Sequence, residues 1–165
     1  MSVVKHPLKP VYDAHSRVLI LGTMPSPKSR EEGFYYAHPQ NRFWRILAAL
    51  FQEPLPVSNT EKRAFVLAHH IALWDVLASC EIQGAADHSI RRPVANDLRP
   101  VLEAAPVRAI FTTGRKASEL YRRLCLPQTG RASVYLPSPS AANCRDCTLE
   151  QLVCAYRVLL KYTDF

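Results

Sequence analysis

Short apolar runs that stop at glycine, proline or threonine recur along the chain and predict buried strands. Two of them are RVLILG at 17–22 and VRAIFTT at 107–113, which contain β-branched residues and, in the second, one phenylalanine. Shorter runs of the same kind lie at 71–76 and 133–136. Apolar runs of this length, bounded by turn residues, are typical of parallel strands covered on both faces. The pattern therefore predicts four strands.

Between these runs, apolar residues recur at the spacing of an amphipathic helix. Phe43, Ile46, Leu47 and Leu50 predict a helix over about 40–51, and a second helix is expected over 61–69. Thr148, followed three residues later by Gln151, predicts the capped start of the last helix. Further helical spacing follows the third strand, at Ala117, Leu120, Tyr121 and Leu124.

Strands that alternate with helices indicate the α/β class. We expect a three-layer fold in which a four-stranded parallel sheet is flanked by helices on both faces. With 165 residues and no linker, repeat or low-complexity segment, the chain is predicted to form one domain over 1–165, with a core at about 15–162.

Composition narrows the class of protein. No run of eighteen apolar residues occurs and no signal peptide opens the sequence, so we expect a soluble, monomeric protein of the cytoplasm, or of the nucleus in a eukaryote. The five cysteines have no disulfide pattern and are expected to be free thiols. The net charge of +7 suits a polyanionic partner such as nucleic acid.

Several ligand motifs are absent. The glycines before Gly114-Arg115-Lys116 do not have P-loop spacing, and no GxGxxG follows the first strand. Cys144 and Cys147 have a metal-like spacing but no second pair, so they are read as incidental thiols. The sequence predicts no metal and no cofactor.

Two polar loops follow predicted strands, at 22–44 and 136–143. Because the carboxyl ends of parallel strands meet at one edge of a sheet, the two loops are expected to close on one flat, polar ligand. Tyr36 lies where an aromatic ring can stack on a base, whereas Phe43 and Trp44 fit the core. Asn41 has two interpretations, a helix cap or a functional amide.

The spacing of Gly22, Pro25, Ser29, Gly33, Tyr36 and the segment HPQNRFW at 38–44 resembles the uracil-DNA glycosylase superfamily. The resemblance is closest to its mismatch-specific and hypoxanthine-DNA (deoxyinosine) branches. LPSPS at 136–140 and the helix after Thr148 are similar to the second motif and closing helix of that group. LWDVLASC at 73–80 is similar to the deoxyinosine branch in particular.

This resemblance implies a monofunctional DNA glycosylase of base excision repair that hydrolyses the N-glycosidic bond of hypoxanthine in DNA. Two alternatives stay open: excision of uracil or thymine from mismatches, and nucleic-acid binding with weak catalysis. The implied partner is double-stranded DNA that contains deaminated bases, with single-stranded DNA as an alternative. A monofunctional enzyme is expected because no loop lysine is evidently positioned to form a Schiff base, with Lys28 as the alternative.

The resemblance also assigns roles to residues. Met24 stands where uracil and mismatch glycosylases carry Asp or Asn, so water positioning is expected to pass to Asn41. His38 either contributes to catalysis or bridges loop backbones, and Asp75 is expected to be structural. The base pocket is predicted to contain Gly22, Thr23, Met24, Pro25, Ser29 and Tyr36. DNA contacts are predicted for Ser138, Pro139, Ser140, Ala141, Asn143, Arg42 and Lys116, with Asn143 alternatively a turn residue.

Overall fold

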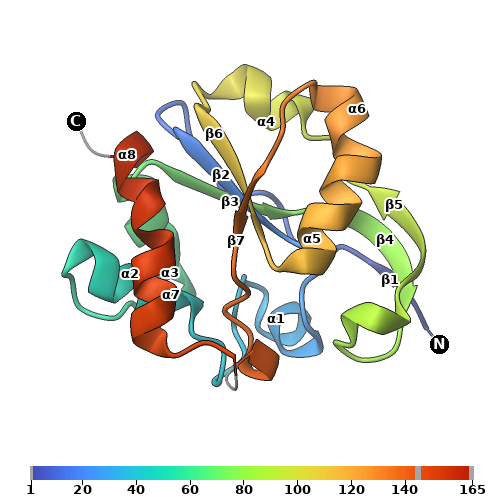
Figure 1. Ribbon diagram of the computed structural model, residues 1–165, viewed down its shortest axis with the longest axis horizontal. Coiled ribbons are helices and arrows are strands. Elements are labelled where there is room, and N and C mark those ends of the chain that lie inside the picture. The colour runs from blue at the N-terminus through green and yellow to red at the C-terminus, as the bar shows by residue number, and fades with distance from the viewer. Residues whose placement is uncertain (1, 144–145, 164–165) are drawn as a thin grey trace.

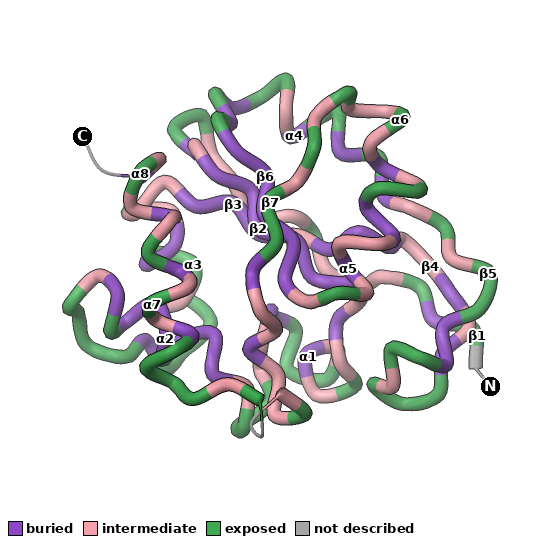
Figure 2. Tube along the Cα trace, viewed as in Figure 1, coloured by how far each residue is buried: buried purple, intermediate pink, exposed green. Residues whose placement is uncertain are grey.

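The computed structural model describes residues 2–143 and 146–163. Its centre is a four-stranded parallel sheet in the order β3-β2-β6-β7, as predicted (Figure 1). The strands are β2 (Val18–Gly22), β3 (Ile71–Asp75), β6 (Ala109–Thr113) and β7 (Val134–Leu136). Every residue of β2 and β6 is buried, which explains the unbroken apolar runs in the sequence (Figure 2).

One face of this sheet is covered by helices that include the two predicted after the first loop and at the C-terminal end (Figure 1). Phe43 and Trp44 are buried in this layer, so their core assignment is confirmed. Thr148 and Gln151 form the predicted capping box. The elements of this layer are α2 (Phe43–Phe51), α3 (Asn59–Ala68), α7 (Leu149–Tyr156), η4 (Arg157–Leu159) and α8 (Leu160–Thr163).

The opposite face carries α4 (Arg99–Ala104), α5 (Arg115–Leu120), the π-helical turn η2 (Tyr121–Cys125) and α6 (Leu126–Thr129). Helices therefore flank the sheet on both sides, and the predicted three-layer α/β class is confirmed (Figure 1). Within the described ranges, no helix is both long and apolar enough to cross a membrane.

A second, antiparallel sheet was not predicted. It has the order β1-β4-β5 and consists of β1 (Ser2–Lys5), β4 (Leu77–Ile82) and β5 (Arg91–Ala95). β4 follows β3 after a single residue, Val76, and begins directly after the strand predicted at 71–76. Because β1 pairs with β4 and Val11 bridges to Leu73, the folded core begins well before residue 15, which corrects the predicted limit.

The polar loops gather at the carboxyl ends of the parallel strands. β2 leads into α1 (Pro27–Glu32), whose first turn is capped by Ser26. β7 leads into the short turn η3 (Ala141–Asn143), and the β4–β5 connection holds η1 (Asp87–Ser89). Figure 1 shows these segments along the same edge of the molecule. The topology thus brings the two predicted loops, and one that was not predicted, to a common site.

Candidate active site

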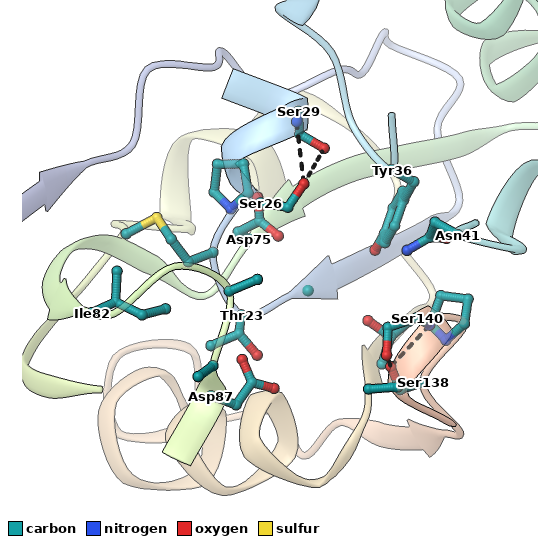
Figure 3. A pocket seen from close by; sticks show the side chains of 18 of the residues that line it. Thr23, Ser26, Ser29, Tyr36, Asn41, Asp75, Ile82, Asp87, Ser138 and Ser140 are labelled. Atoms are coloured by element: carbon teal, nitrogen blue, oxygen red, sulfur yellow. Dashed lines mark hydrogen bonds between the residues drawn. The ribbon is translucent and has the colours of Figure 1, made fainter. Parts of the chain in front are cut away.

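A cavity of about 630 Å³ opens at this edge, a size suited to a small-molecule ligand or a single base. Its walls come from five segments and the end of β6 (Figure 3). We call the strand-end residues Gly22, Asp75 and Thr113 the floor, and the loop residues Tyr36, Asn41, Ser138 and Ser140 the rim. Also in the lining are Thr23, Met24, Pro25, Ser26, Ser29, Tyr35, Ile82, Gly84, Ala85, Ala86, Asp87, His88, Pro139 and Ala142.

Asn41 lies half-buried in the rim. Its Oδ1 accepts a hydrogen bond from the Phe43 N–H at 2.9 Å, which ties the side chain to the start of α2. This bond identifies the amide oxygen, and the amide nitrogen faces the cavity in Figure 3. The carbonyl oxygen keeps a second lone pair. The N-cap position of α2 is Arg42, so Asn41 forms a local side-chain turn just before the helix rather than its cap, and it also lines the cavity.

Tyr36 presents only one face of its ring to the cavity. The other face is stacked on Phe43, with ring centroids 3.9 Å apart and an angle of 15° between the planes. Its backbone has φ 53°, a left-handed conformation that a non-glycine residue adopts at some cost. Burial, followed by the negative charge of Asp75, raises the pKa of Tyr36, so its hydroxyl stays neutral. A flat base can stack on the remaining face.

Met24 is half-buried in the wall and packs against the core on the α4–α5 side of the sheet. A thioether neither takes up a proton nor binds water firmly, so this position supplies apolar surface. Thr23, Pro25 and Ser29 are buried and line the cavity as well. The Ser29 hydroxyl accepts from the Ala37 N–H at 3.1 Å and thereby connects α1 to the segment that carries Tyr36.

Arg42, for which a DNA contact was predicted, is buried with only 8% of its surface exposed. Its guanidinium donates to the backbone carbonyls of Cys147 at 2.6 Å and Ser140 at 3.3 Å. Its backbone N–H donates to the Pro139 carbonyl at 2.9 Å. Arg42 therefore joins the two loops to each other, and its contact with DNA stays a prediction.

In the second loop, Ser138, Pro139 and Ser140 line the cavity, whereas Ala141 and Asn143 do not. The Ser138 hydroxyl donates to Ser140 Oγ at 3.1 Å, so the Ser140 hydroxyl hydrogen is directed elsewhere. Asn143 donates its side-chain amide to the Ser138 carbonyl at 2.9 Å, which favours its interpretation as a turn residue.

Two other predicted residues lie outside the lining. His38 is exposed, and its Nδ1 accepts from the Gln40 N–H at 3.1 Å, so the structural alternative fits its position. Lys116 is half-exposed, and its charge acts on the carboxyl of Asp87 at the cavity wall. Its contact with DNA stays a prediction.

Two parts of the cavity wall, the β4–β5 connection and Asp75, were not predicted as site residues. The end of β4 and the β4–β5 connection supply Ile82 and residues 84–88 of the lining, and neither strand was predicted. Asp75 was placed with the structural residues, yet it lines the floor and accepts a 2.8 Å hydrogen bond from His6. Asp75 ends a parallel strand, so the rule that identified the two loops applies to it equally.

Potential metal ligands are scattered. Over the described ranges, no group of three or more His, Cys, Asp or Glu residues is arranged to hold a metal ion. Cys147 is half-buried and unpaired, and Cys144 lies outside the described residues.

Residues 9–156 match the family model of the uracil DNA glycosylase superfamily. The chain belongs to that superfamily. The match covers the first loop, the second loop and all of α7, so the cavity lies within the matched region. The family prediction made from the loop motifs is confirmed.

Individual relatives match over nearly the same span. A protein of Methanosarcina acetivorans named hypoxanthine DNA glycosylase is 37% identical over 87% of this chain and 90% of its own length. A protein of the same name from Methanosarcina barkeri is 33% identical over 86% and 89%. A solution NMR structure from Methanosarcina acetivorans, provisionally assigned as a uracil DNA glycosylase, superposes with a TM-score of 0.79 at 31% identity over 96% of this chain and 99% of that one.

Proposed function

We propose that this protein is a DNA glycosylase that hydrolyses the N-glycosidic bond of deoxyinosine and releases hypoxanthine. The observation that carries the proposal is the position of the Asn41 amide in the rim of a base-sized cavity, in a chain whose named relatives are hypoxanthine DNA glycosylases. The base enters the cavity after it has rotated out of the duplex, which costs least at a deaminated, weakly paired position.

The chemistry needs an oriented water more than a strong base. Glycosidic cleavage develops an oxocarbenium-like sugar, so a water held at the open face of C1′ attacks as the base departs. An amide cannot accept a proton fully, but the NH2 group of Asn41 that faces the cavity can donate to this water, and the free lone pair of Oδ1 can accept from it. The base leaves with the electrons of the C1′–N9 bond, and backbone N–H groups of the first loop stabilise it.

A hydrolytic rather than a lyase mechanism is supported by the state of Lys28. Its ammonium lies 3.1 Å from Glu32 Oε1 and 3.8 Å from Glu31 Oε1, outside the cavity lining. The hydrogen bond to Glu32, followed by the charges of Glu31 and Glu32, raises the pKa of Lys28. A protonated amine is no nucleophile, so Schiff-base formation by this residue is disfavoured.

One experiment tests the proposal. The protein is incubated with duplexes that hold a single deoxyinosine, uracil or xanthine, and abasic sites are then cleaved with alkali. We expect deoxyinosine to be cleaved fastest, and cleavage to persist in chelator. Asn41→Ala should abolish most of it, whereas Asn59→Ala, an exposed amide on α3, should not.

The second candidate is excision of uracil or of related mismatched bases, which the assignment of the NMR neighbour favours. Uracil cleaved clearly faster than deoxyinosine would select it. Binding without release of any base would instead indicate a nucleic-acid-binding member of the superfamily without turnover.

A further inference from the structure

The β4–β5 connection brings an acidic side chain to the cavity that the proposed reaction does not use. Asp87 is the first residue of the short turn η1 and lines the cavity. Figure 3 shows its carboxyl group directed toward Thr23 and into the cavity. The cavity therefore holds a titratable group that comes from neither of the two predicted loops.

Hydrogen bonds fix the turn that carries Asp87. The hydroxyl of Ser89 accepts from the Gln83 N–H at 2.9 Å and donates to the Ala86 carbonyl at 2.6 Å. Ser89 and its neighbour Ile90 are both buried. The backbone at Asp87 is thus held against the core, and the carboxyl group is presented from a defined position.

Asp87 lies on the side of the cavity that borders the second loop. Lys116, at the start of α5, is near enough for its charge to act on the Asp87 carboxyl group. α5 begins after Gly114, where an added Cβ would lie 3.3 Å from the Ser138 Cβ. Ser138 belongs to the rim, where the sugar of the flipped nucleotide is expected. Asp87 therefore faces the ring of the base that is joined to the sugar.

The carboxyl group has no hydrogen-bonding partner in the protein. Among the described residues, no hydrogen bond and no ion pair reaches it. The titratable groups that face it are Lys116 on α5, His88 on the same turn and the thiol of Cys80 on β4. Burial, and to a smaller extent the charge of Asp87, raises the pKa of Cys80. A ligand atom can therefore take a hydrogen bond from Asp87 without displacing a protein partner.

The surroundings favour the neutral form of this acid. Desolvation at the cavity wall raises the pKa of Asp87, and the charges of Lys116 and His88 offset part of the rise. A base that fills the cavity removes further water from the carboxyl group and raises its pKa more. An aspartic acid kept neutral in this way is a hydrogen-bond donor.

We propose that Asp87 is the general acid of the reaction, which donates its proton to N7 of the flipped hypoxanthine as the C1′–N9 bond breaks. The inference rests on the proposed function. The electrons of the C1′–N9 bond pass to the base, which leaves as neutral hypoxanthine with a hydrogen on N7. The oxygen of the water that Asn41 orients bonds to C1′, and the proton that this water gives up restores the acid form of Asp87.

This role separates purines from pyrimidines. In hypoxanthine and xanthine, the ring joined to the sugar presents the lone pair of N7. Uracil has only C–H groups along the corresponding edge, so it offers Asp87 no atom to protonate. Asp87 should therefore accelerate the release of purines and be dispensable for the release of uracil.

The decisive experiment measures single-turnover rates of the wild-type protein and Asp87→Asn on matched deoxyinosine and deoxyuridine duplexes, from about pH 5 to about pH 9. The wild-type rate on deoxyinosine should be level at low pH and fall above the pKa of Asp87, where the acid is ionised. Asp87→Asn should show no such break and should be about 100-fold slower on deoxyinosine. Its rate on deoxyuridine should change little.

Two further variants separate acid catalysis from a structural role. Lys116→Ala should move the break to higher pH, because the charge of Lys116 lowers the pKa of Asp87. Asp97→Asn, which changes an exposed carboxylate paired with Arg99, should leave the rates and the break unchanged. If Asp87→Asn does not fold, or if the wild-type protein cleaves deoxyinosine only, the position of the break in the remaining proteins decides the question.

An equal loss on both substrates in Asp87→Asn, a break that persists in that variant or a break that Lys116→Ala does not move would overturn the inference and leave the proposed function intact. Wild-type protein that releases no hypoxanthine from any duplex would overturn the proposed function, and the inference with it.

Discussion

At the rim of the cavity the functional side chains lie on loops, whereas at the floor they end β-strands. The rim residues Tyr36 and Asn41 are held by contacts with Phe43 at the start of α2. The floor residues Gly22 and Asp75 are opposite each other in the β2–β3 register, so the sheet itself fixes them. The difference suggests a division of labour in which the rim acts on the sugar and water, and the floor and the turn η1 face the base.

The largest effect is expected at the rim. Asn41→Ala removes the amide that orients water, so single-turnover cleavage of deoxyinosine should fall about 100- to 1,000-fold, the range seen when one transition-state hydrogen-bonding group is removed. Rates on deoxyinosine and uracil duplexes should fall together. Loss on one substrate alone would show that Asn41 reads the base, and would remove the division between rim and floor.

The next largest effect is expected at Arg42, whose hydrogen bonds connect the two loops. Arg42→Ala removes two hydrogen bonds of a buried guanidinium and leaves the Ser140 and Cys147 carbonyls without this donor. The free energy of unfolding in urea should fall by about 3 kcal/mol. Arg63→Ala, an exposed arginine on α3, is the control and should change it little. A stable Arg42→Ala with weakened DNA binding would instead restore the phosphate contact predicted from the sequence.

The stability of the protein at alkaline pH tests whether the Tyr36 ring stays packed on Phe43. Its folded-state pKa is raised, so its contribution to stability is complete below the unfolded value of about 10 and is lost as pH rises above that value. Between about pH 10 and pH 11 the wild-type protein should lose about 1 kcal/mol more than Tyr36→Phe, measured by urea unfolding at each pH.

Tyr162→Phe, which removes the hydroxyl of a half-buried tyrosine on α8, serves as the matched control. Equal alkaline losses in the wild-type protein and Tyr36→Phe would mean that the Tyr36 ring moves out to solvent, and that the rim is not fixed by its stack on Phe43.

The smallest effect is expected outside both regions. Lys116 is half-exposed at the start of α5, and removal of one phosphate contact should weaken binding uniformly across sequences. Lys116→Ala should reduce the slope of log affinity against log salt by about 1, measured by fluorescence anisotropy with a labelled duplex. An unchanged slope would show that Lys116 makes no contact with a DNA phosphate.

The sequence predicted the rim better than the floor. Every residue that the family resemblance implied for the base pocket lines the cavity. The burial of Arg42 was not predicted, because its charge suggests a contact with phosphate, and only the structure shows its three hydrogen bonds to backbone carbonyls about 100 positions away.

The pairing of Asp75 with His6 could not be predicted, for a different reason. Their pairing depends on β1 lying against β4, a long-range contact with no local pattern. A buried carboxylate after a strand reads as structural until it is seen to face a cavity. The features that were not predicted, the β1–β4 pairing and the His6–Asp75 contact, depend on long-range pairing rather than on local propensity.

The most direct test of this account measures Asn41→Ala and Asp87→Asn side by side on deoxyinosine and deoxyuridine duplexes, under single-turnover conditions. The account predicts that Asn41→Ala lowers both rates and keeps their ratio, whereas Asp87→Asn lowers the ratio of the deoxyinosine rate to the deoxyuridine rate. A ratio changed by Asn41→Ala, or kept by Asp87→Asn, would contradict the division between a rim that acts on the sugar and water and a turn that acts on the base.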